Sequence, residues 1–320
     1  MILLVNFGGP RHLNEIAFFL NDLLTDRDVI RTKLPAAIHR WLFGRIARKR
    51  AGKIREDYEL IGGRSPIYFD TEQIANLLNQ KLHPTITFHR YLSATHGESL
   101  AEIENCPEET IEVLPLFPQF SYATTGSIAR FLDDHLSENA VKKLRWVKSF
   151  AAAEPFIRSY TNCIRSFLQQ NQIAEEETIL LYSSHGVPQS FIDTGDVYQA
   201  ECIESFDAIS KNFPRALNKL SFQSKFGPGQ WIKPYTEQTC ESVLSWNQGR
   251  KKIVVIPLSF TSDHIETLYE IESLYLPILV EKGLLAYRCP ALNLEPQWID
   301  SLIEIAKGPK FFSTDELIRK

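Results

Sequence analysis

The chain has 320 residues and a formal net charge of −4, with 35 Lys and Arg against 39 Asp and Glu. This near balance argues against a general nucleic-acid binder, and the 44% hydrophobic content, with 20 Phe, supplies a full core and excludes global disorder. Gly at 15 and Pro at 17 exclude collagen-like and low-complexity architectures. The length suits one large α/β domain or two domains of roughly 150 residues.

Short apolar runs alternate with helix-period segments along the whole chain. The runs expected as strands are Ile2–Phe7, Thr85–Leu92, Ile111–Leu116, Arg145–Phe150, Thr178–Ser183, Lys219–Gln223, Ile253–Leu258 and Leu285–Arg288. The segments expected as helices are Glu15–Leu24, Thr71–Leu82, Ser127–His135, Ile157–Leu168, Val197–Ile209 and Ile265–Glu281. This alternation predicts an α/β fold with parallel sheets flanked by helices.

The two halves of the sequence look alike. Val113-Leu-Pro-Leu-Phe recurs as Val255-Ile-Pro-Leu-Ser-Phe, and Phe7-Gly-Gly-Pro has a counterpart in His185-Gly-Val-Pro. We therefore expect two similar doubly wound domains of the Rossmann or flavodoxin-like type, over residues 1–150 and 151–320, with the last helix packing back on the first domain. Chance similarity among α/β strand ends is the alternative. Ligands of such folds bind beyond the carboxyl ends of the strands, and two facing domains would form a cleft there.

Several common signatures are missing from the sequence. It has no P-loop, no G-x-G-x-x-G after the first strand, no G-x-S-x-G and no H-E-x-x-H. Its five cysteines are scattered and form no C-x-x-C, which excludes a disulfide framework and a cysteine zinc site. The start, Met1-Ile-Leu-Leu-Val, has no basic segment or cleavage site, and no apolar run approaches the roughly 18 residues of a membrane span. We therefore expect a cytoplasmic protein.

His185 follows the apolar run that ends at Ser184 and precedes Gly186. A neutral imidazole at such a strand end can accept a proton near pH 7 or ligate a metal. A histidine that is simply tied to a neighbouring loop is the other interpretation, and the position alone leaves the two open.

A cluster of acids follows the strand Ile253–Leu258. Asp263, Glu266 and Glu270 are three and four residues apart, so a helix would stack them on one face, where they could pass a cation along. Asp263-x-x-Glu266 also fits a capping box, and taken alone it favours the cap. A helix cap would not require Glu270 or His264, the residue next to Asp263.

Two further segments carry polar or basic character. Residues 36–55 contain seven Lys and Arg interleaved with Trp41 and other apolar residues, which fits either an interfacial amphipathic helix or an ordinary solvated helix face. Arg64, in the polar loop that follows, could pair with a substrate carboxylate or lie in solvent. The run from Phe222 to Trp231 mixes aromatics, a cation and turn formers, so it suits a flat aromatic ligand or plain loop packing.

Together these segments resemble the ferrochelatases, enzymes that insert ferrous iron into a porphyrin to make haem. The resemblance spans nearly the whole chain and rests on the runs Leu3–Pro10, Tyr58–Ile67, Leu114–Ser121, Thr124–Ser127, Ser184–Pro188, Phe222–Pro228, Trp231, Pro234–Thr236, Asp263–Leu268 and Pro290–Asn293. Each run alone is weak evidence for the family, but all of them in this order are highly specific for it. The resemblance implies two similar doubly wound domains facing across a porphyrin cleft, and a lyase-type metal chelatase of haem and porphyrin biosynthesis.

The resemblance also assigns roles to individual residues. It makes His185 and Glu266 catalytic, and it gives the metal four contacts: His185, Glu266, Asp263 and Glu270. The residues that it places against the porphyrin are Phe7, Arg64, Arg90, Tyr91, Tyr122, Pro188, Trp231 and His264. The cleft lip corresponds to residues from about 30 to 67, and many family members touch the membrane there, which implies peripheral contact of residues 36–50 with the inner face of the membrane.

The sequence departs from the family pattern in two places. Family members often have an aromatic-His pair after the Arg-Tyr, but Leu92-Ser93 stands here, and His96 comes three residues too late to replace it. No cysteine follows Cys289, so the C-terminal cysteines that hold an iron–sulfur cluster in some members are absent. We expect no iron–sulfur cluster and no tightly bound cofactor, with Fe²⁺ and porphyrin as substrates.

Three other functions stay open on the sequence alone. The substrate could be a coproporphyrin-type intermediate instead of protoporphyrin IX, although Phe7 and the run from Gln223 favour protoporphyrin. A related chelatase could insert another metal into a different tetrapyrrole. A non-catalytic tetrapyrrole carrier would need aromatic walls but no His185–Glu266 pair.

Overall fold

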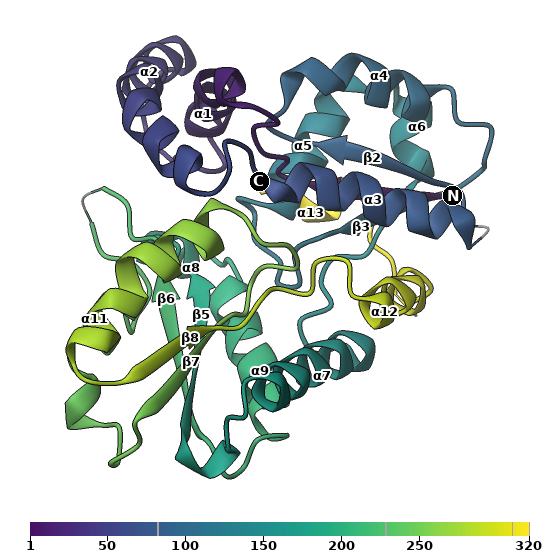
Figure 1. Ribbon diagram of the computed structural model, residues 1–320. Helices are drawn as coiled ribbons and strands as arrows, with labels where there is room; N and C mark the ends of the chain where they lie inside the picture. Colours follow the sequence, from purple (N-terminus) through teal and green to yellow (C-terminus); the bar gives the residue numbers. More distant parts are fainter. Residues whose placement is uncertain (82, 228, 309, 320) are drawn as a thin grey trace. The chain divides into compact units, whose positions relative to one another are not determined.

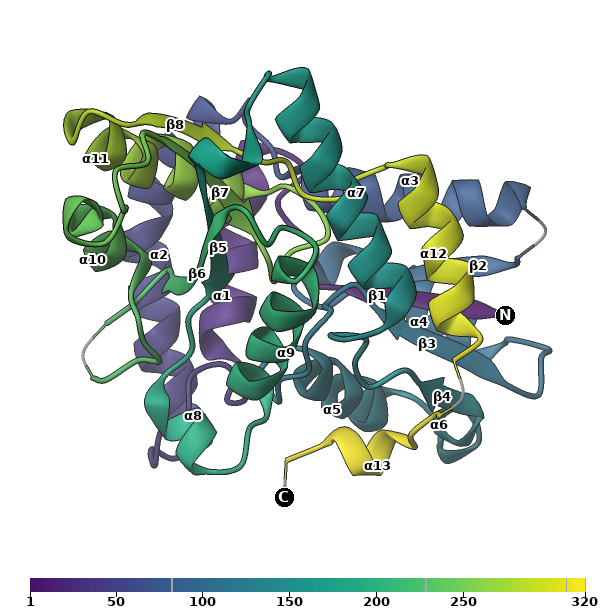
Figure 2. The ribbon, with the colours of Figure 1, turned by 90° about the horizontal axis from the view of Figure 1, so that it is seen from below.

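The computed structural model describes residues 1–81, 83–227, 229–308 and 310–319 (Figures 1 and 2). The chain divides into two compact units. Unit 1 contains Met1–Ser149 together with Leu302–Lys320, and unit 2 contains Phe150–Ser301. Helix α12, Pro296–Ala306, carries the chain from unit 2 back into unit 1.

Unit 1 is built on a four-stranded parallel sheet with the order β2-β1-β3-β4. Its strands are β1 Ile2–Asn6, β2 Thr85–His89, β3 Ile111–Pro115 and β4 Leu144–Trp146. Its helices are η1 Leu13–Glu15, α1 Ile16–Thr25, α2 Ala36–Leu60, α3 Pro66–Gln80, α4 Ser93–Glu104, α5 Thr125–His135, α6 Glu138–Lys143 and α13 Thr314–Leu317. Val5 and Val113 pack on one face of the sheet against Ile128 and Leu132 of α5, together with Leu317 of α13.

Unit 2 repeats this plan with the strand order β6-β5-β7-β8. Its strands are β5 Thr178–His185, β6 Leu217–Gln223, β7 Lys252–Pro257 and β8 Leu285–Arg288. Its helices are α7 Glu154–Gln170, η2 Glu175–Glu177, α8 Gln189–Asp193, α9 Tyr198–Ser210, α10 Thr236–Glu241, η3 Val243–Ser245, the π-helix η4 Glu266–Tyr275 and α11 Leu276–Glu281. Two similar parallel-sheet repeats with flanking helices confirm the predicted fold class.

The strand registers align the two units residue by residue. Val5 of β1 pairs with Pro115 of β3, and Ser183 of β5 pairs with Pro257 of β7. The residue two positions after Val5 is Phe7, and the residue two positions after Ser183 is His185. The repeated sequence runs therefore occupy the same register, and Phe7 and His185 are equivalent positions in the two repeats.

The core of unit 2 follows from the two-residue period of its strands. Leu181 of β5 packs with Ile271 and Leu279, which come from η4 and α11. The next residue, Tyr182, points to the other face, where its ring centroid lies 5.2 Å from that of Phe206 on α9. Both faces of the sheet are thus covered, which explains why the strands read as nearly continuous apolar runs.

All eight predicted strands are present; Leu285–Arg288 has the predicted bounds, and the other seven have at least one shifted end. The strand expected over Thr85–Leu92 ends at His89, because the N–H of Leu92 donates to the His89 carbonyl in a turn. The strand expected over Arg145–Phe150 is Leu144–Trp146. The helix expected over Thr71–Leu82 is α3, and Leu82 lies outside the described residues.

The remaining helix predictions need two corrections. The segment expected as one helix over Ile265–Glu281 is a π-helix followed by α11. The sequence pattern gave no range for α4, α6, α8, α10, α12 or α13, of which α6, α8, α10 and α13 have at most six residues.

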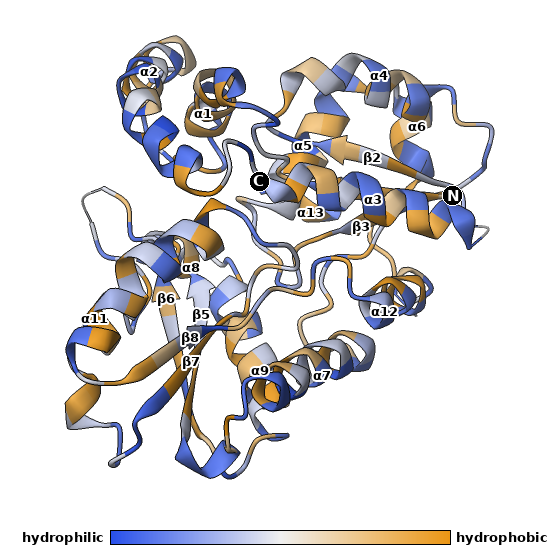
Figure 3. Ribbon diagram, in the orientation of Figure 1, coloured by the Kyte–Doolittle hydropathy of each residue, from blue (hydrophilic) through white to orange (hydrophobic). Residues whose placement is uncertain are grey.

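The 25-residue helix α2 contains the basic segment that the sequence singled out. Long stretches of it are hydrophilic (Figure 3). His39, Gly44, Ala47 and Tyr58 are its buried residues. Over the part of the chain that the structure covers, no helix combines the length and apolar character that a membrane crossing requires.

We predict that Leu181→Ala lowers the free energy of unfolding by about 2–5 kcal/mol, because it leaves a cavity at a fully buried site. Leu285→Ala, in an edge strand of the same sheet, is the matched control, since Leu285 is 56% exposed. Its cost should stay within about 0.5 kcal/mol. Urea unfolding followed by Trp fluorescence measures both, and equal costs would contradict the packing described for this sheet.

Candidate active site

Three strand ends meet at one edge of the unit 2 sheet. His185 is the last residue of β5 and lies in register with Gln223, the last residue of β6. The loop after β7 leads from Pro257 into η4, which begins at Glu266. Because the carboxyl ends of parallel strands lie at the same edge, residues far apart in the sequence come together there.

His185 and Glu266 are in direct contact. His185 Nδ1 lies 2.8 Å from Glu266 Oε2, and the Nε2 of His264 lies 3.6 Å from the same oxygen. The side chains of His185 and Glu266 are 34% and 26% exposed, so the pair is sheltered but reachable. Phe260 lies against this group, with its ring centroid 4.3 Å from that of His264.

The two partners shift each other's pKa. Burial lowers the pKa of His185, but the charge and the hydrogen bond of Glu266 more than offset it, so the pKa is raised from 6.5. For Glu266, burial opposes ionisation, yet the charge and hydrogen bond of His185 and contact with His264 hold its pKa well below the ordinary value of 4.5. The pair therefore favours imidazolium beside carboxylate.

Glu270 behaves in the opposite way. Burial and the nearby charge of Glu266 raise the pKa of Glu270 from 4.5 to about 7. Its Oε2 accepts hydrogen bonds from Ser224 Oγ at 2.5 Å and from Gln223 Nε2 at 3.3 Å. Gln223 Nε2 also donates to the backbone carbonyl of Glu266 at 2.8 Å. One carboxyl of this site is thus ionised while its neighbour titrates near neutral pH.

The helix that carries these acids is a π-helix of ten residues, a rare conformation that is frequent at functional sites. Its buried residues, Thr267, Ile271 and Tyr275, recur every four positions. Glu266 and Glu270 are also four residues apart, and each directly precedes one of the buried residues Thr267 and Ile271. Glu266 contacts His185, and Glu270 contacts Gln223.

Asp263 lies before this helix, so the prediction that it shares one helical face with Glu266 and Glu270 is wrong. The capping box is not formed either, since the helix has no side-chain cap. The carboxylate of Asp263 instead accepts hydrogen bonds from Thr267 Oγ1 at 2.8 Å, Arg288 Nη1 at 2.8 Å and Asn293 Nδ2 at 2.9 Å. Thr267 lies in η4 itself, Arg288 ends β8 and Asn293 lies in the loop after β8, and the acid spacing could not reveal these partners.

Trp231 lies beside the backbone that follows His185. It forms an isolated antiparallel bridge with Pro188. A Cβ on Gly186 would lie 3.5 Å from the ring atom Cε3 of Trp231 and only 2.8 Å from the carbonyl oxygen of Gln223. Glycine is therefore required for this close approach. Pro228, which belongs to the same sequence run, lies outside the described residues.

In unit 1, the structure shows Arg90 and Tyr91 in a polar cluster. Arg90 Nη2 donates to Asp26 Oδ2 at 2.8 Å, and the hydroxyl of Tyr91 donates to the same oxygen at 3.0 Å. Ser127 Oγ donates to it as well, at 2.5 Å. Tyr91 has no exposed surface. These contacts favour a structural role, and porphyrin contact by Arg90 and Tyr91 stays a prediction.

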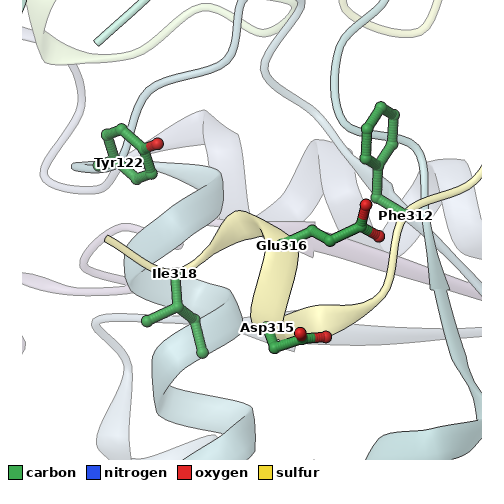
Figure 4. A pocket seen from close by; sticks show the side chains of 5 residues that line it. All are labelled: Tyr122, Phe312, Asp315, Glu316 and Ile318. Atoms are coloured by element: carbon green, nitrogen blue, oxygen red, sulfur yellow. The ribbon is translucent and has the colours of Figure 1, made fainter. Parts of the chain in front are cut away.

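The other residues expected to bind substrate in unit 1 are more accessible. Phe7 is partly buried, with its ring centroid 5.2 Å from that of Tyr91. Arg64 is exposed, with its guanidinium 4.5 Å from the ring centroid of Phe69. Tyr122 lines a shallow cavity of about 400 Å³ together with Phe312, Asp315, Glu316 and Ile318 (Figure 4).

Sequence reasoning missed the residues that hold the backbone of His185. Its N–H donates to Ser259 Oγ at 2.8 Å, and its carbonyl accepts from the hydroxyl of Tyr198 at 2.9 Å. Ser259 belongs to the repeated strand-end run, which was the one signal that could have identified it. Among the described residues, no group of three or more His, Cys, Asp or Glu is arranged to hold a metal ion.

Solved structures show where this architecture recurs. CbiX, the terminal enzyme for biosynthesis of sirohaem in denitrifying bacteria, matches with a TM-score of 0.52 and 14% identity over 96% of this chain and 97% of that one. SirB from Bacillus subtilis with Fe³⁺ matches with a TM-score of 0.54 and 11% identity over 96% and 93%. At this level of identity the matches show the fold alone, an α/β protein of two repeated parallel sheets, one of which carries the histidine–carboxylate pair at its edge.

Sequence comparison gives the family. The sequence model described as Ferrochelatase matches residues 1–308. Ferrochelatases of Chlamydia pneumoniae and Chlamydia caviae are each 44% identical over 318 residues, covering 99% of this chain and 95% and 98% of those proteins. A ferrochelatase of Chlamydia abortus is 42% identical, covering 99% of this chain and 98% of that protein. The chain belongs to the ferrochelatase family, whose members insert iron into a porphyrin in haem biosynthesis.

We predict that Glu270→Gln removes a pH-dependent loss of stability. Because the pKa of Glu270 is raised to about 7, the folded state holds a proton that the unfolded state has released. Wild-type stability therefore falls as pH rises from about 4.5 through about 7, by about 1–3 kcal/mol relative to Glu270→Gln.

Urea unfolding of metal-free protein at pH 5 and pH 8 measures this difference. Glu281→Gln, at the exposed end of α11, is the control and should track the wild type at both pH values. Parallel pH profiles for wild type and Glu270→Gln would contradict the assigned pKa.

Proposed function

We propose that this chain inserts ferrous iron into protoporphyrin, with His185 accepting the protons that the porphyrin releases. The observation that carries the proposal is the 2.8 Å contact between His185 Nδ1 and Glu266 Oε2, in a chain of the ferrochelatase family. Fe²⁺ replaces two pyrrole protons, so the reaction needs an acceptor for those protons.

The contact with Glu266 selects the reactive nitrogen of His185. A carboxylate facing Nδ1 holds the proton there, which leaves the lone pair of the neutral imidazole on Nε2. When Nε2 takes a proton, the ring becomes an imidazolium beside a carboxylate, which is the arrangement that raises its pKa. Glu266 thus orients the base and stabilises its protonated form.

Glu270 offers the next place for the proton. Its pKa of about 7 matches the pH at which a cytoplasmic enzyme operates, so it can both take and release a proton. Gln223 contacts both the backbone of Glu266 and the carboxylate of Glu270, which keeps the two acids close. The same carboxylates supply oxygen atoms to ferrous iron while it loses its water ligands.

In this proposal iron takes part only as a substrate, without a resident iron–sulfur cluster. The five cysteines have free thiols, and Cys106, Cys202, Cys240 and Cys289 are buried. Burial raises the pKa of Cys202 and Cys240 to about 12, so these thiols stay protonated instead of binding a cluster as thiolates.

Trp231 supplies an aromatic surface next to this base. A planar porphyrin hides its inner nitrogens from an incoming metal, and distortion of the ring exposes their lone pairs. The bridge to Pro188 and the close approach to Gly186 hold Trp231 in place on the His185 side. We propose that this surface imposes the distortion.

We predict that His185→Ala lowers the rate of iron insertion at least 100-fold, since a general base contributes about 10²–10⁴-fold, while porphyrin binding is retained. Anaerobic absorbance measurements follow metallation, and porphyrin fluorescence follows binding. His135→Ala, an exposed histidine, is the control and should keep wild-type turnover.

Each substrate is tested in the same assay. Faster turnover with coproporphyrin than with protoporphyrin would identify coproporphyrin as the natural substrate. The proposed role of His185 would stay the same. Wild-type turnover by His185→Ala would refute the role, and tight porphyrin binding without turnover by the wild type would favour a carrier.

We also propose that α2 makes peripheral contact with an anionic membrane. Trp41 is 61% exposed and Ile38 is 50% exposed, and the exposed cations Arg40, Arg45 and Arg48 lie beside them. The guanidinium of Arg45 lies 5.3 Å from the ring centroid of Trp41. Exposed aromatic and aliphatic residues flanked by cations are typical of helices that lie at a lipid surface.

We predict that Trp41→Ala weakens sedimentation with phosphatidylglycerol vesicles at least about threefold, because it removes exposed apolar area from the contact. Leu244→Ala, at a 58% exposed site in unit 2, is the control and should sediment like the wild type. The proposal fails if the wild type does not sediment with these vesicles at low salt.

A further inference from the structure

We propose that Asp263, Thr267 and Arg288 form a positioning cluster that fixes His264 and Glu266 in front of His185. The inference rests on the proposed roles of His185 and Glu266. It gives Asp263 a different task from metal binding, and it brings Arg288, which no motif singled out, into the reaction.

The cluster joins the start of η4 to the end of β8. Arg288 is the last residue of β8, and its Nη1 lies 2.8 Å from Asp263 Oδ1 while its Nε lies 2.7 Å from Glu272 Oε1. Asp263 precedes η4, and Glu272 lies within it. One guanidinium therefore contacts both the segment that leads into η4 and η4 itself, with two different N–H groups.

Thr267 links this charge pair to the functional residues. Its hydroxyl donates to Asp263 Oδ1 at 2.8 Å and accepts the backbone N–H of His264 at 2.9 Å. The hydrogen bond from Thr267 to Asp263 closes the backbone between these two residues into a small loop, and both His264 and Glu266 lie in that loop. Thr267 has no exposed surface, which leaves its hydroxyl no solvent partner.

The surrounding loop is held from further sides. Asn293 Nδ2 donates to Asp263 Oδ2 at 2.9 Å, and Asn293 Oδ1 accepts the N–H of Asp263 at 2.7 Å. The hydroxyl of Tyr160, from α7, donates to the carbonyl of Phe260 at 2.8 Å. Such redundant anchoring suits a segment whose geometry must be held within a fraction of an ångström.

The state of the Asp263 carboxylate supports positioning over metal binding. It accepts hydrogen bonds from Thr267, Arg288, Asn293 and, at 3.4 Å, the N–H of Ala291. Its side chain is 10% exposed. A metal would have to displace these donors from a sheltered, charge-paired carboxylate, which costs more than binding to Glu266 or Glu270.

Thr267→Val tests the proposal, because it removes the hydroxyl and leaves the Asp263–Arg288 pair in place. We expect kcat for iron insertion to fall about tenfold, since small misplacement of catalytic groups is costly. The KM for ferrous iron and the porphyrin affinity should change less than about twofold, because Asp263 binds neither. Thr267→Ser keeps the hydroxyl and should recover most of kcat.

Two controls separate positioning from general damage. Thr239→Val removes another buried hydroxyl, whose partner is the backbone carbonyl of Tyr235 at the start of the same helix, and should keep wild-type kcat. Arg288→Lys keeps the charge but cannot reach Asp263 and Glu272 together, so its kcat should also fall several-fold. If Thr267→Val does not fold, Arg288→Lys decides the question.

Several results would overturn the proposal. They are wild-type kcat in folded Thr267→Val or Arg288→Lys, no recovery in Thr267→Ser, an equal loss in Thr239→Val, or a tenfold rise in the KM for iron with kcat unchanged, which would return Asp263 to metal binding. His185→Ala is assayed alongside. If it is inactive while Thr267→Val is normal, only this inference fails, and if His185→Ala is fully active, the proposed function fails first.

Discussion

The electrostatics at the edge of the unit 2 sheet depend on the contact between His185 and Glu266. A histidine alone at a strand end would titrate near its ordinary pKa, and a lone sheltered carboxylate would tend to stay protonated. In contact, each residue favours the charged form of the other, and this outweighs the effect of burial on the pKa of both groups. The negative charge of Glu266 then makes ionisation of Glu270 harder. Burial is the larger cause of the raised pKa of Glu270, and the charge of Glu266 adds to it.

This contact is available because of the order of the strands. β5 lies between β6 and β7, so the end of β5 is flanked by the loops that follow its two neighbours. The loop after β6 supplies Ser224, and the loop after β7 leads to Glu266 and Glu270. The hydroxyls of Ser259 and Tyr198 hydrogen-bond to the backbone of His185 and hold it in place. The fold itself thus orients the proposed base, His185.

The sequence predicted what local patterns encode and missed what distant partners decide. Alternation of apolar residues located all eight strands, and the repeated runs indicated that both sheets share one plan. Ten residues are too few to distinguish a period of four from one of 3.6, so the π-helix was expected as an α-helix. The direction of Asp263 depends on Arg288, 25 residues later, and the burial of Tyr91 depends on Asp26, 65 residues earlier. No spacing rule contains those contacts.

The two repeats share one strand order but place different residue types at equivalent positions. Phe7 and His185 occupy equivalent positions in the two repeats. Arg90 and Gln223 are equivalent as well, because Gln223 is in register with His185, and Arg90 and Phe7 directly follow the register pair of His89 and Asn6. In unit 1 the second position holds a buried acid, because Arg90 pairs with Asp26. In unit 2 the same position holds the backbone of the helix that carries the acids. The central strand can therefore end in an apolar ring, Phe7, or in a titratable imidazole, His185. In both repeats a side chain from the end of the neighbouring strand, Arg90 or Gln223, holds the segment beside it.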